Sequence, residues 1–147
     1  MERVIDCPVE PKHYRADACA VWCFDDRFSP LLGRLIAETR SAHVDLVKVA
    51  GGAKGLASPA NKSERAYLLD QIAKSVKLHA PKEIWLMVHA DCGAYGSPKF
   101  ENNDAEATFF GGELTKAESA VRSFFEKNGI TAPIKKYFAD FKGIIEM

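Results

Sequence analysis

The sequence predicts an α/β fold: an open, mostly parallel sheet of four to five strands in the order 2-1-3-4, with a short last strand and helices on both faces. Short apolar segments alternate with amphipathic segments of helical period along most of the chain. Capping residues stand where those helices should begin, and glycine or proline stands where they should end. The 147 residues, 47% of them hydrophobic, suit a single domain spanning 1–147.

The first half of the chain begins with a polar, proline-containing segment, 1–16, which we expect to be an irregular arm. Residues 18–23 (ACAVWC) form a compact apolar run of strand length. A helix should follow, with Ser29 as its N-cap and Pro30 at its first position. Residues 44–49 (VDLVKV) are rich in β-branched side chains and predict the second strand, which leads into a glycine-rich loop.

A longer helix is predicted next, because Asn61 and Glu64 stand as N-cap and reciprocal capping partner. Pro81 should end it, and the apolar run 83–88 predicts the third strand. Residues 97–112 are expected to be a long irregular or partly helical excursion, either a mobile flap or a segment that faces a dimer partner.

The last third of the chain predicts one more helix and two strands. Thr115 and Glu118 have the spacing of a capping box that would open the helix, and Gly129 stands where it should end. Residues 134–138 predict the fourth strand, and 144–147 predict a last short strand after a turn.

The charge balance argues against nucleic acid or an anionic membrane as partner, since 20 basic residues match 20 acidic ones. No apolar run approaches the ~20 residues of a membrane span, and the first residues lack the apolar stretch of a signal peptide. We therefore expect a cytoplasmic protein whose four cysteines are reduced.

Two polar motifs follow the predicted first and third strands. Parallel sheets bind ligands at the carboxyl ends of their strands, where the strand order reverses, so Cys23 and His89 should lie face to face. Cys92 follows His89 by three residues. Two thiolates and one imidazole suit Zn²⁺, and three protein ligands leave a fourth position open, as in catalytic zinc sites. Either motif alone is also common at ordinary strand ends, but together they predict a metal site.

Asp25 and Arg27 stand two residues apart beside that site and can form a bidentate ion pair. Arg27 would then hold Asp25 off the metal, where it could orient a metal-bound water. If Arg27 released it, Asp25 could become the fourth ligand and close the site. Both states remain possible from the sequence.

The other candidate ligands receive structural interpretations. Cys19 would lie roughly 13 Å from Cys23 along a strand, so we expect it in the core. Cys7 has no predicted role. The remaining histidines are expected to be solvated, in the arm or as charges at helix ends: His13, His43 and His79. Both tryptophans, Trp22 and Trp85, are expected in the core.

The motifs CxDxR and HxxCG on a short α/β chain resemble the β-class carbonic anhydrases. The segments VKVAGG and YFADFKGIIEM also resemble stretches of that family. The resemblance implies that Cys23, His89 and Cys92 bind zinc, and that Asp25 and Arg27 are the catalytic dyad. It implies reversible hydration of carbon dioxide to bicarbonate by zinc-bound hydroxide, in a homodimer or dimer of dimers.

The chain departs from the family pattern at Lys48, where arginine is usual, at Asp26, where a small or neutral residue is usual, and in its short N-terminal segment. Relatives use the same zinc frame on carbonyl sulfide or carbon disulfide, so those substrates remain alternatives, as does a non-catalytic zinc-stabilised domain. Candidate pocket walls are Phe24, Phe28 and Tyr95. Proton transfer is left open between Asp91, Asp26 and buffer.

Overall fold

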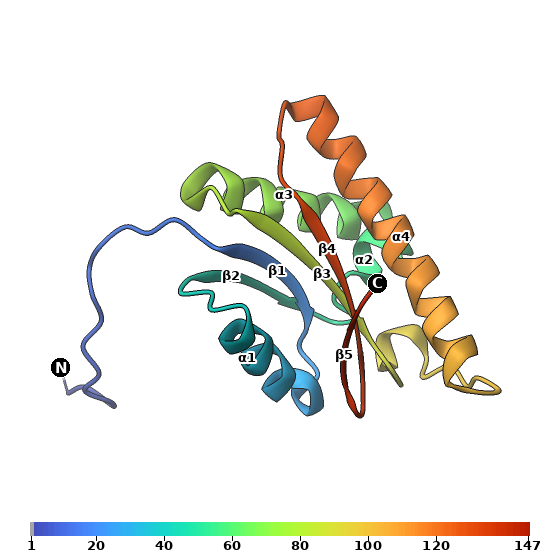
Figure 1. Ribbon diagram of the computed structural model, residues 1–147. Coiled ribbons are helices and arrows are strands. Elements are labelled where there is room, and N and C mark those ends of the chain that lie inside the picture. The colour runs from blue at the N-terminus through green and yellow to red at the C-terminus, as the bar shows by residue number, and fades with distance from the viewer. Residues whose placement is uncertain (1) are drawn as a thin grey trace.

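A five-stranded sheet forms the centre of the computed structural model, which describes residues 2–147 (Figure 1). The strands are β1 (Ala18–Cys23), β2 (Val44–Val49), β3 (Glu83–His89), β4 (Ile134–Asp140) and β5 (Gly143–Glu146). Their order is β2-β1-β3-β4-β5, and only β5 is antiparallel to its neighbour. The predicted fold class and strand order are confirmed.

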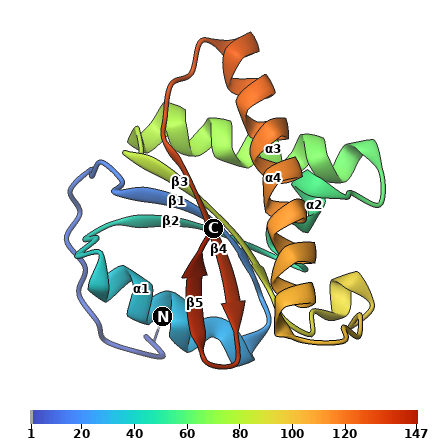
Figure 2. The ribbon, with the colours of Figure 1, turned by 45° about the vertical axis from the view of Figure 1, so that its right-hand side comes forward.

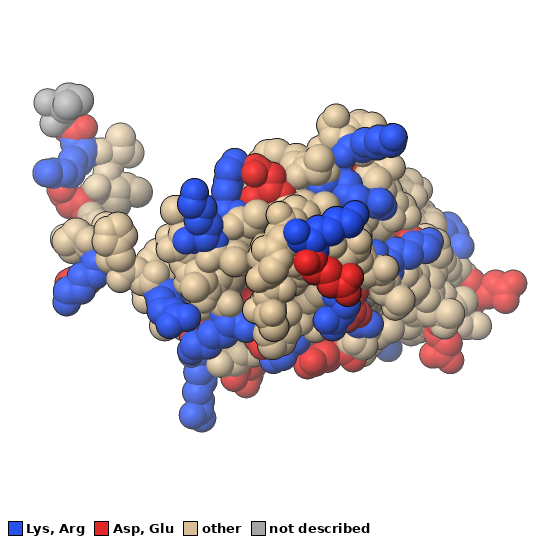
Figure 3. Space-filling view, turned by 90° about the horizontal axis from the view of Figure 1, so that it is seen from above, with Lys and Arg blue, Asp and Glu red and all other residues tan. Residues whose placement is uncertain are grey.

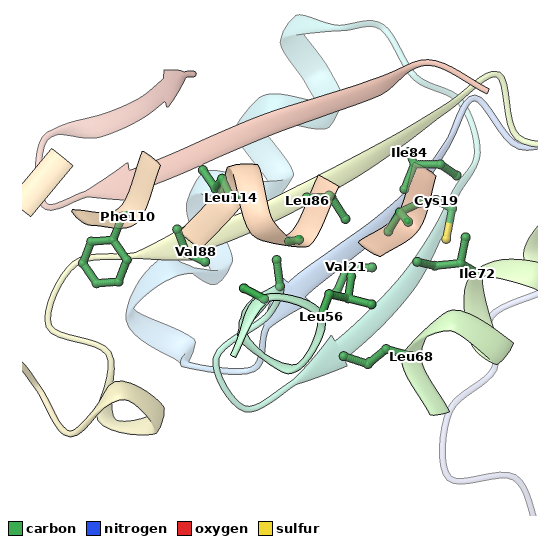
Figure 4. Packing of buried hydrophobic residues seen from close by; sticks show 14 of the residues in the cluster. Cys19, Val21, Leu56, Leu68, Ile72, Ile84, Leu86, Val88, Phe110 and Leu114 are labelled. Carbon is green, nitrogen blue, oxygen red and sulfur yellow. The ribbon is translucent and has the colours of Figure 1, made fainter. Parts of the chain in front are cut away.

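Helices cover both faces of the sheet (Figures 1 and 2). They are α1 (Ser29–Glu38), α2 (Lys54–Ala57), α3 (Lys62–His79) and α4 (Asn103–Asn128), with short 3-10 turns at Asp26–Phe28 and Gly93–Tyr95. Alternate residues of β1 and β3 point to opposite faces, as the strand period requires. One set packs under α2, α3 and α4 (Figure 4), and the other packs under α1.

The strands that carry the candidate site are buried on both faces. Every residue of β1 is buried, including Cys19 and Trp22, and β3 is buried from Ile84 onward, including Trp85. This explains why both strands are apolar runs without alternation. The core placements predicted for Cys19 and the two tryptophans are confirmed.

Residues 97–112 are partly helical, as predicted, because helix α4 begins within this segment. The helix begins at Asn103, where Asn102 acts as N-cap by accepting a hydrogen bond from the Ala105 amide. Thr115 lies inside this helix, and its hydroxyl donates to the Gly111 carbonyl one turn earlier instead of capping a new helix. The prediction that the helix starts at Thr115 is wrong, because packing over the sheet sustains the helix through the Gly111-Gly112 pair.

The other helices differ from the prediction in two smaller ways. Helix α1 has Phe28 rather than Ser29 at its N-cap, and Pro30 lies within its first turn. The glycine-rich loop after β2 contains the short helix α2, which the sequence pattern does not predict. The start of α3 is confirmed: the Asn61 side chain accepts from the Glu64 amide.

The amino ends of the strands hold a polar cluster that fixes the root of the N-terminal arm. The Asp45 carboxylate accepts hydrogen bonds from Tyr14 Oη (2.8 Å), Ser75 Oγ (2.6 Å) and His79 Nδ1 (2.8 Å). The Tyr14 ring stacks between His79 and His43, with centroids 4.2 and 4.6 Å away. His79 ends α3 and His43 is exposed, as predicted, but the sequence did not predict the stacking of both rings on Tyr14 or the bond from His79 to Asp45. Residues 2–13 are exposed and form no helix or strand.

The surface carries both signs of charge. On the face shown in Figure 3, acidic and basic side chains are interspersed. Among residues 2–147, the helices include none that is both long and apolar enough to cross a bilayer.

Candidate metal centre

Three side chains from two strand ends meet in one buried group. Cys23 ends β1, His89 ends β3, and Cys92 lies in the loop after β3. Their candidate ligand atoms all lie within 4.8 Å of one another, and all three residues are buried. The parallel neighbours β1 and β3 end at the same edge of the sheet, which is why the topology joins residues so distant in sequence.

The His89 ring is oriented by its backbone neighbour. Its Nδ1 donates to the Ala90 carbonyl at 2.8 Å, which leaves Nε2 facing the thiols. Nε2 is buried and has no hydrogen-bond partner. The Phe28 ring packs against the imidazole with centroids 4.3 Å apart. A buried polar atom without a partner is costly unless a ligand completes it, so the ring is arranged as a metal ligand would be.

The two thiols differ in their proton affinity. A hydrogen bond from Cys92 lowers the pKa of the Cys23 thiol to about 4, although burial opposes this shift. The same interaction and burial raise the pKa of Cys92. Burial would lower the pKa of His89, but the Cys23 thiolate and the Ala90 carbonyl raise it overall. Cys23 therefore deprotonates more readily than Cys92, and a thiolate is the form of cysteine that binds a metal ion.

Backbone amides also support the Cys23 sulfur. Gly51 N–H donates to Cys23 Sγ at 3.3 Å, and Asp25 N–H approaches it at 3.5 Å. Gly51 has φ +75° and Gly52 has φ +57°, and a β-carbon at Gly52 would clash with the Met87 carbonyl oxygen. Side chains are disfavoured at both positions, so the glycine pair after β2 is needed to bring this loop against the thiol.

Asp25 and Arg27 form the predicted bidentate pair. Arg27 Nε donates to Asp25 at 3.1 Å and Nη2 donates at 2.7 Å, while the Arg27 amide caps the same carboxylate at 3.1 Å. These donors hold the pKa of Asp25 below its usual value. Its Oδ2 lies 3.9 Å from His89 Nε2, beside the candidate metal-ligand group formed by Cys23, His89 and Cys92.

Arg27 has a second acidic partner that the sequence pattern does not pair with it. Its Nη1 donates to Asp91 Oδ2 at 3.1 Å, and its Nη2 approaches the Asp91 carbonyl at 3.3 Å. Asp91 lies in the HxxC loop with φ +51°. Asparagine and aspartate tolerate a positive φ better than most residues, so an aspartate in this loop is compatible with such a turn. The sequence alone, however, does not show which residue adopts a positive φ, and the contact between Asp91 and Arg27 could not be predicted from it.

The donor set fits a metal ion. Two sulfurs and one imidazole nitrogen suit Zn²⁺, and the buried Nε2 has no hydrogen-bond partner that would compete with a metal. Cys19 is buried elsewhere in β1 and is not part of it.

The remaining residues that the sequence suggested for the site differ in whether they lie next to the candidate metal-ligand group. Phe28 and Tyr95 pack beside the group, whereas the Phe24 side chain is 62% exposed. Lys48 Nζ donates to Ser29 Oγ at 2.9 Å, and Asp26 is exposed.

Comparison with known proteins identifies the family. A sequence model of the family described as "Putative carbonic anhydrase" matches residues 14–134. The chain belongs to this carbonic anhydrase family. No curated protein matches it. The family assignment predicted from CxDxR and HxxCG is confirmed.

Solved carbonic anhydrases share the fold. The β-carbonic anhydrase isoform I of Trichomonas vaginalis is 18% identical with a TM-score of 0.55, over 96% of this chain and 87% of that one. The enzyme from Streptococcus mutans is 17% identical with a TM-score of 0.52, over the same shares. One of two tetrameric β-carbonic anhydrases from Sordaria macrospora is 16% identical with a TM-score of 0.51, over 91% of this chain and 81% of that one.

Proposed function

We propose that this protein is a zinc enzyme that reversibly hydrates carbon dioxide to bicarbonate. One observation carries the proposal: the Cys23–His89–Cys92 group, with its unpartnered Nε2, lies beside the Asp25–Arg27 pair in a chain of the carbonic anhydrase family. Zinc held there would act as a Lewis acid that lowers the pKa of a bound water toward neutrality.

The chain's own residues would divide the remaining work. Cys23, His89 and Cys92 would hold the metal, and the two thiols must be deprotonated to do so. Asp25 would accept a hydrogen bond from the attacking water and orient it. Arg27 would keep Asp25 ionised and directed away from the metal, because its fork occupies both carboxylate oxygens. Phe28 and Tyr95 would provide apolar surface near a small, uncharged substrate.

A stopped-flow pH-indicator assay tests the activity directly. Protein purified without added metal should contain about one equivalent of zinc and accelerate carbon dioxide hydration. Parallel assays with carbonyl sulfide and carbon disulfide test the substrate alternatives on the same preparation. Full zinc with no activity on any of the three would leave a non-catalytic zinc-stabilised domain instead.

The oligomer is a separate part of the proposal: a homodimer or a dimer of dimers. The fold shared with the Sordaria macrospora enzymes, which are described as tetrameric, supports it. Phe24 and Phe141, 62% and 68% exposed, are large apolar side chains that a partner could cover. Phe110, in the segment that the sequence suggested for this role, is fully buried in the core. Light scattering at micromolar concentration should give at least twice the 16.2 kDa chain mass.

Two further parts concern the chain as a whole. We propose a single domain over 1–147, with the arm attached through Tyr14, so that mild proteolysis should remove only residues before Tyr14. We also propose the cytoplasm as its compartment, which the requirement for reduced thiol ligands supports.

A further inference from the structure

Arg27 forms a second ion pair, with Asp91, in addition to its pair with Asp25. Its Nε and Nη2 are taken up by Asp25, while Nη1 donates to Asp91. The guanidinium has five N–H donors in a fixed planar fork, so both carboxylates are served at once by different hydrogens. The two carboxylates therefore do not compete for the same nitrogen of Arg27.

The Asp91 contact ties together the two loops that carry the metal-ligand group. Arg27 follows β1 and Asp91 follows β3, 64 residues later. Asp91 presents its carboxylate and its carbonyl to the same guanidinium, at 3.1 and 3.3 Å. It does so from φ +51°, a conformation that costs free energy for a residue other than glycine. Among residues 2–147, the candidate metal group does not include Asp91.

The arginine needs such support because it is half exposed. The Arg27 side chain is 49% exposed, against 22% for Asp25. Apart from these carboxylates its guanidinium meets the Phe28 and Phe141 rings, each 5.7 Å from the guanidinium carbon. A guanidinium held from one side only would rotate more freely, and Asp25 would then be released within 3.9 Å of His89 Nε2.

We propose that Asp91 is a positioning residue for Arg27: it fixes the guanidinium across the two loops, and thereby keeps Asp25 off the metal. The inference rests on the proposed function, since it concerns which of two coordination states the zinc centre adopts. Asp91 contacts neither metal nor substrate in this role, and acts only through Arg27.

The experiment measures the open state without using enzymatic activity. Azide is titrated into Co²⁺-substituted protein and followed in the visible spectrum, because an anion binds only where Asp25 has not taken the fourth position. The apparent dissociation constant rises as the open fraction falls. We expect Asp91→Ala to weaken azide by about twofold, and at most about fivefold, as for loss of a partly exposed ion pair. Asp91→Asn, which tolerates the same backbone and keeps one acceptor, should lie between it and wild type.

The Asp26→Asn control separates positioning from charge. Asp26 is exposed and forms no hydrogen bond to Arg27, and its replacement removes the same negative charge near the site. Loss of charge alone should strengthen azide binding, so Asp26→Asn and Asp91→Ala should shift the dissociation constant in opposite directions. Thermal melts of every variant show whether the fold is retained.

A double-mutant cycle decides whether Asp91 acts through Arg27. In an Arg27→Ala background, Asp91→Ala should no longer weaken azide. Equal weakening in both backgrounds, or azide affinity at the wild-type value in Asp91→Ala, overturns the inference while leaving the zinc centre intact. A wild-type protein that takes up no cobalt overturns the zinc centre itself. A crystal structure of zinc-loaded Asp91→Ala should show Asp25 moved toward the metal.

Discussion

Each end of the sheet holds a histidine beside a carboxylate, but the two ends differ in whether the polar atoms of the histidine have hydrogen-bond partners. At the amino ends, Asp45 accepts from three donors, and His79 is both hydrogen-bonded and stacked. At the carboxyl ends, His89 Nε2 is buried without a partner, between two thiols and Asp25.

This difference distinguishes a structural cluster from a candidate binding site. A satisfied network stabilises the fold and needs nothing further, whereas a buried, unpaired acceptor costs free energy until a ligand completes it. The amino-end cluster fastens the arm to β2 and α3. The carboxyl-end group has the composition and the missing partner of a metal centre. Mutations at the two ends should therefore affect different measurements.

The largest expected effect is loss of the metal from the carboxyl-end group. Cys92→Ala should reduce zinc from about one equivalent to nearly none by elemental analysis, because two ligands remain. Cys19→Ala is the matched control: it removes a buried thiol from the same strand as Cys23 and should keep its zinc. A chelator should lower the melting temperature of wild type but not of Cys92→Ala. Full zinc in Cys92→Ala would contradict the ligand assignment.

The next effect concerns activity with zinc retained. Arg27→Ala should keep its zinc but lose carbon dioxide hydration by about 100-fold or more, because the released Asp25 carboxylate can bind the metal. Asp25→Asn should also keep zinc and be slow, since an amide accepts the hydrogen bond without charge. The control is Arg34→Ala, which removes another exposed arginine–carboxylate pair, with Glu38 at 3.0 Å on α1, that includes none of the candidate ligands.

Stopped-flow rates normalised to zinc content check this prediction. A surface ion pair without a catalytic role would contribute at most ~1 kcal/mol of stability and leave the rate unchanged. Hydration at the wild-type rate in both Arg27→Ala and Asp25→Asn would remove the pair from the mechanism.

Much of this arrangement could be predicted from the sequence because it depends on local pattern and topology. The buried strands β1 and β3 are unbroken apolar runs, and the order 2-1-3-4 by itself brings Cys23 and His89 to one edge. What could not be predicted depends on tertiary packing. Helix α4 runs through Gly111-Gly112, where the apparent capping box at Thr115 was the stronger local signal.

The same limit applies to the polar contacts. The pairing of Arg27 with Asp91 joins residues 64 apart and depends on a left-handed backbone at Asp91. The Tyr14 stack depends on the arm folding back between His43 and His79. Neither contact can be predicted from the spacing of residues, because a sequence shows residue types but does not show which loops lie next to each other.

At the amino end, removing the common acceptor should reduce stability and leave the metal in place. Asp45→Ala deprives Tyr14, Ser75 and His79 of their acceptor, and we expect a loss of about 2–3 kcal/mol in the free energy of unfolding. Zinc content should stay at about one equivalent. Asp70→Ala, which removes an exposed pair with Lys74 and an exposed hydrogen bond from Gln71 on the same helix as Ser75, should cost about 0.5 kcal/mol or less. Zinc loss in Asp45→Ala would show that the two ends are not independent.

The smallest expected effect is the pH dependence of the stability that the Asp45 carboxylate contributes. Burial raises the pKa of Asp45, but hydrogen bonds from Ser75, His79 and Tyr14 outweigh it, so the folded-state pKa lies below the ordinary 3.8. A depressed carboxyl pKa contributes stability that is present above the unfolded-state value and is lost as pH falls through the folded-state value. An asparagine side chain cannot titrate, so the difference in unfolding free energy between wild type and Asp45→Asn should shrink as pH falls below about 4. Urea unfolding from pH 6 to pH 3 measures this difference, and a gap of constant size over that range would mean that the charge on Asp45 does not stabilise the cluster.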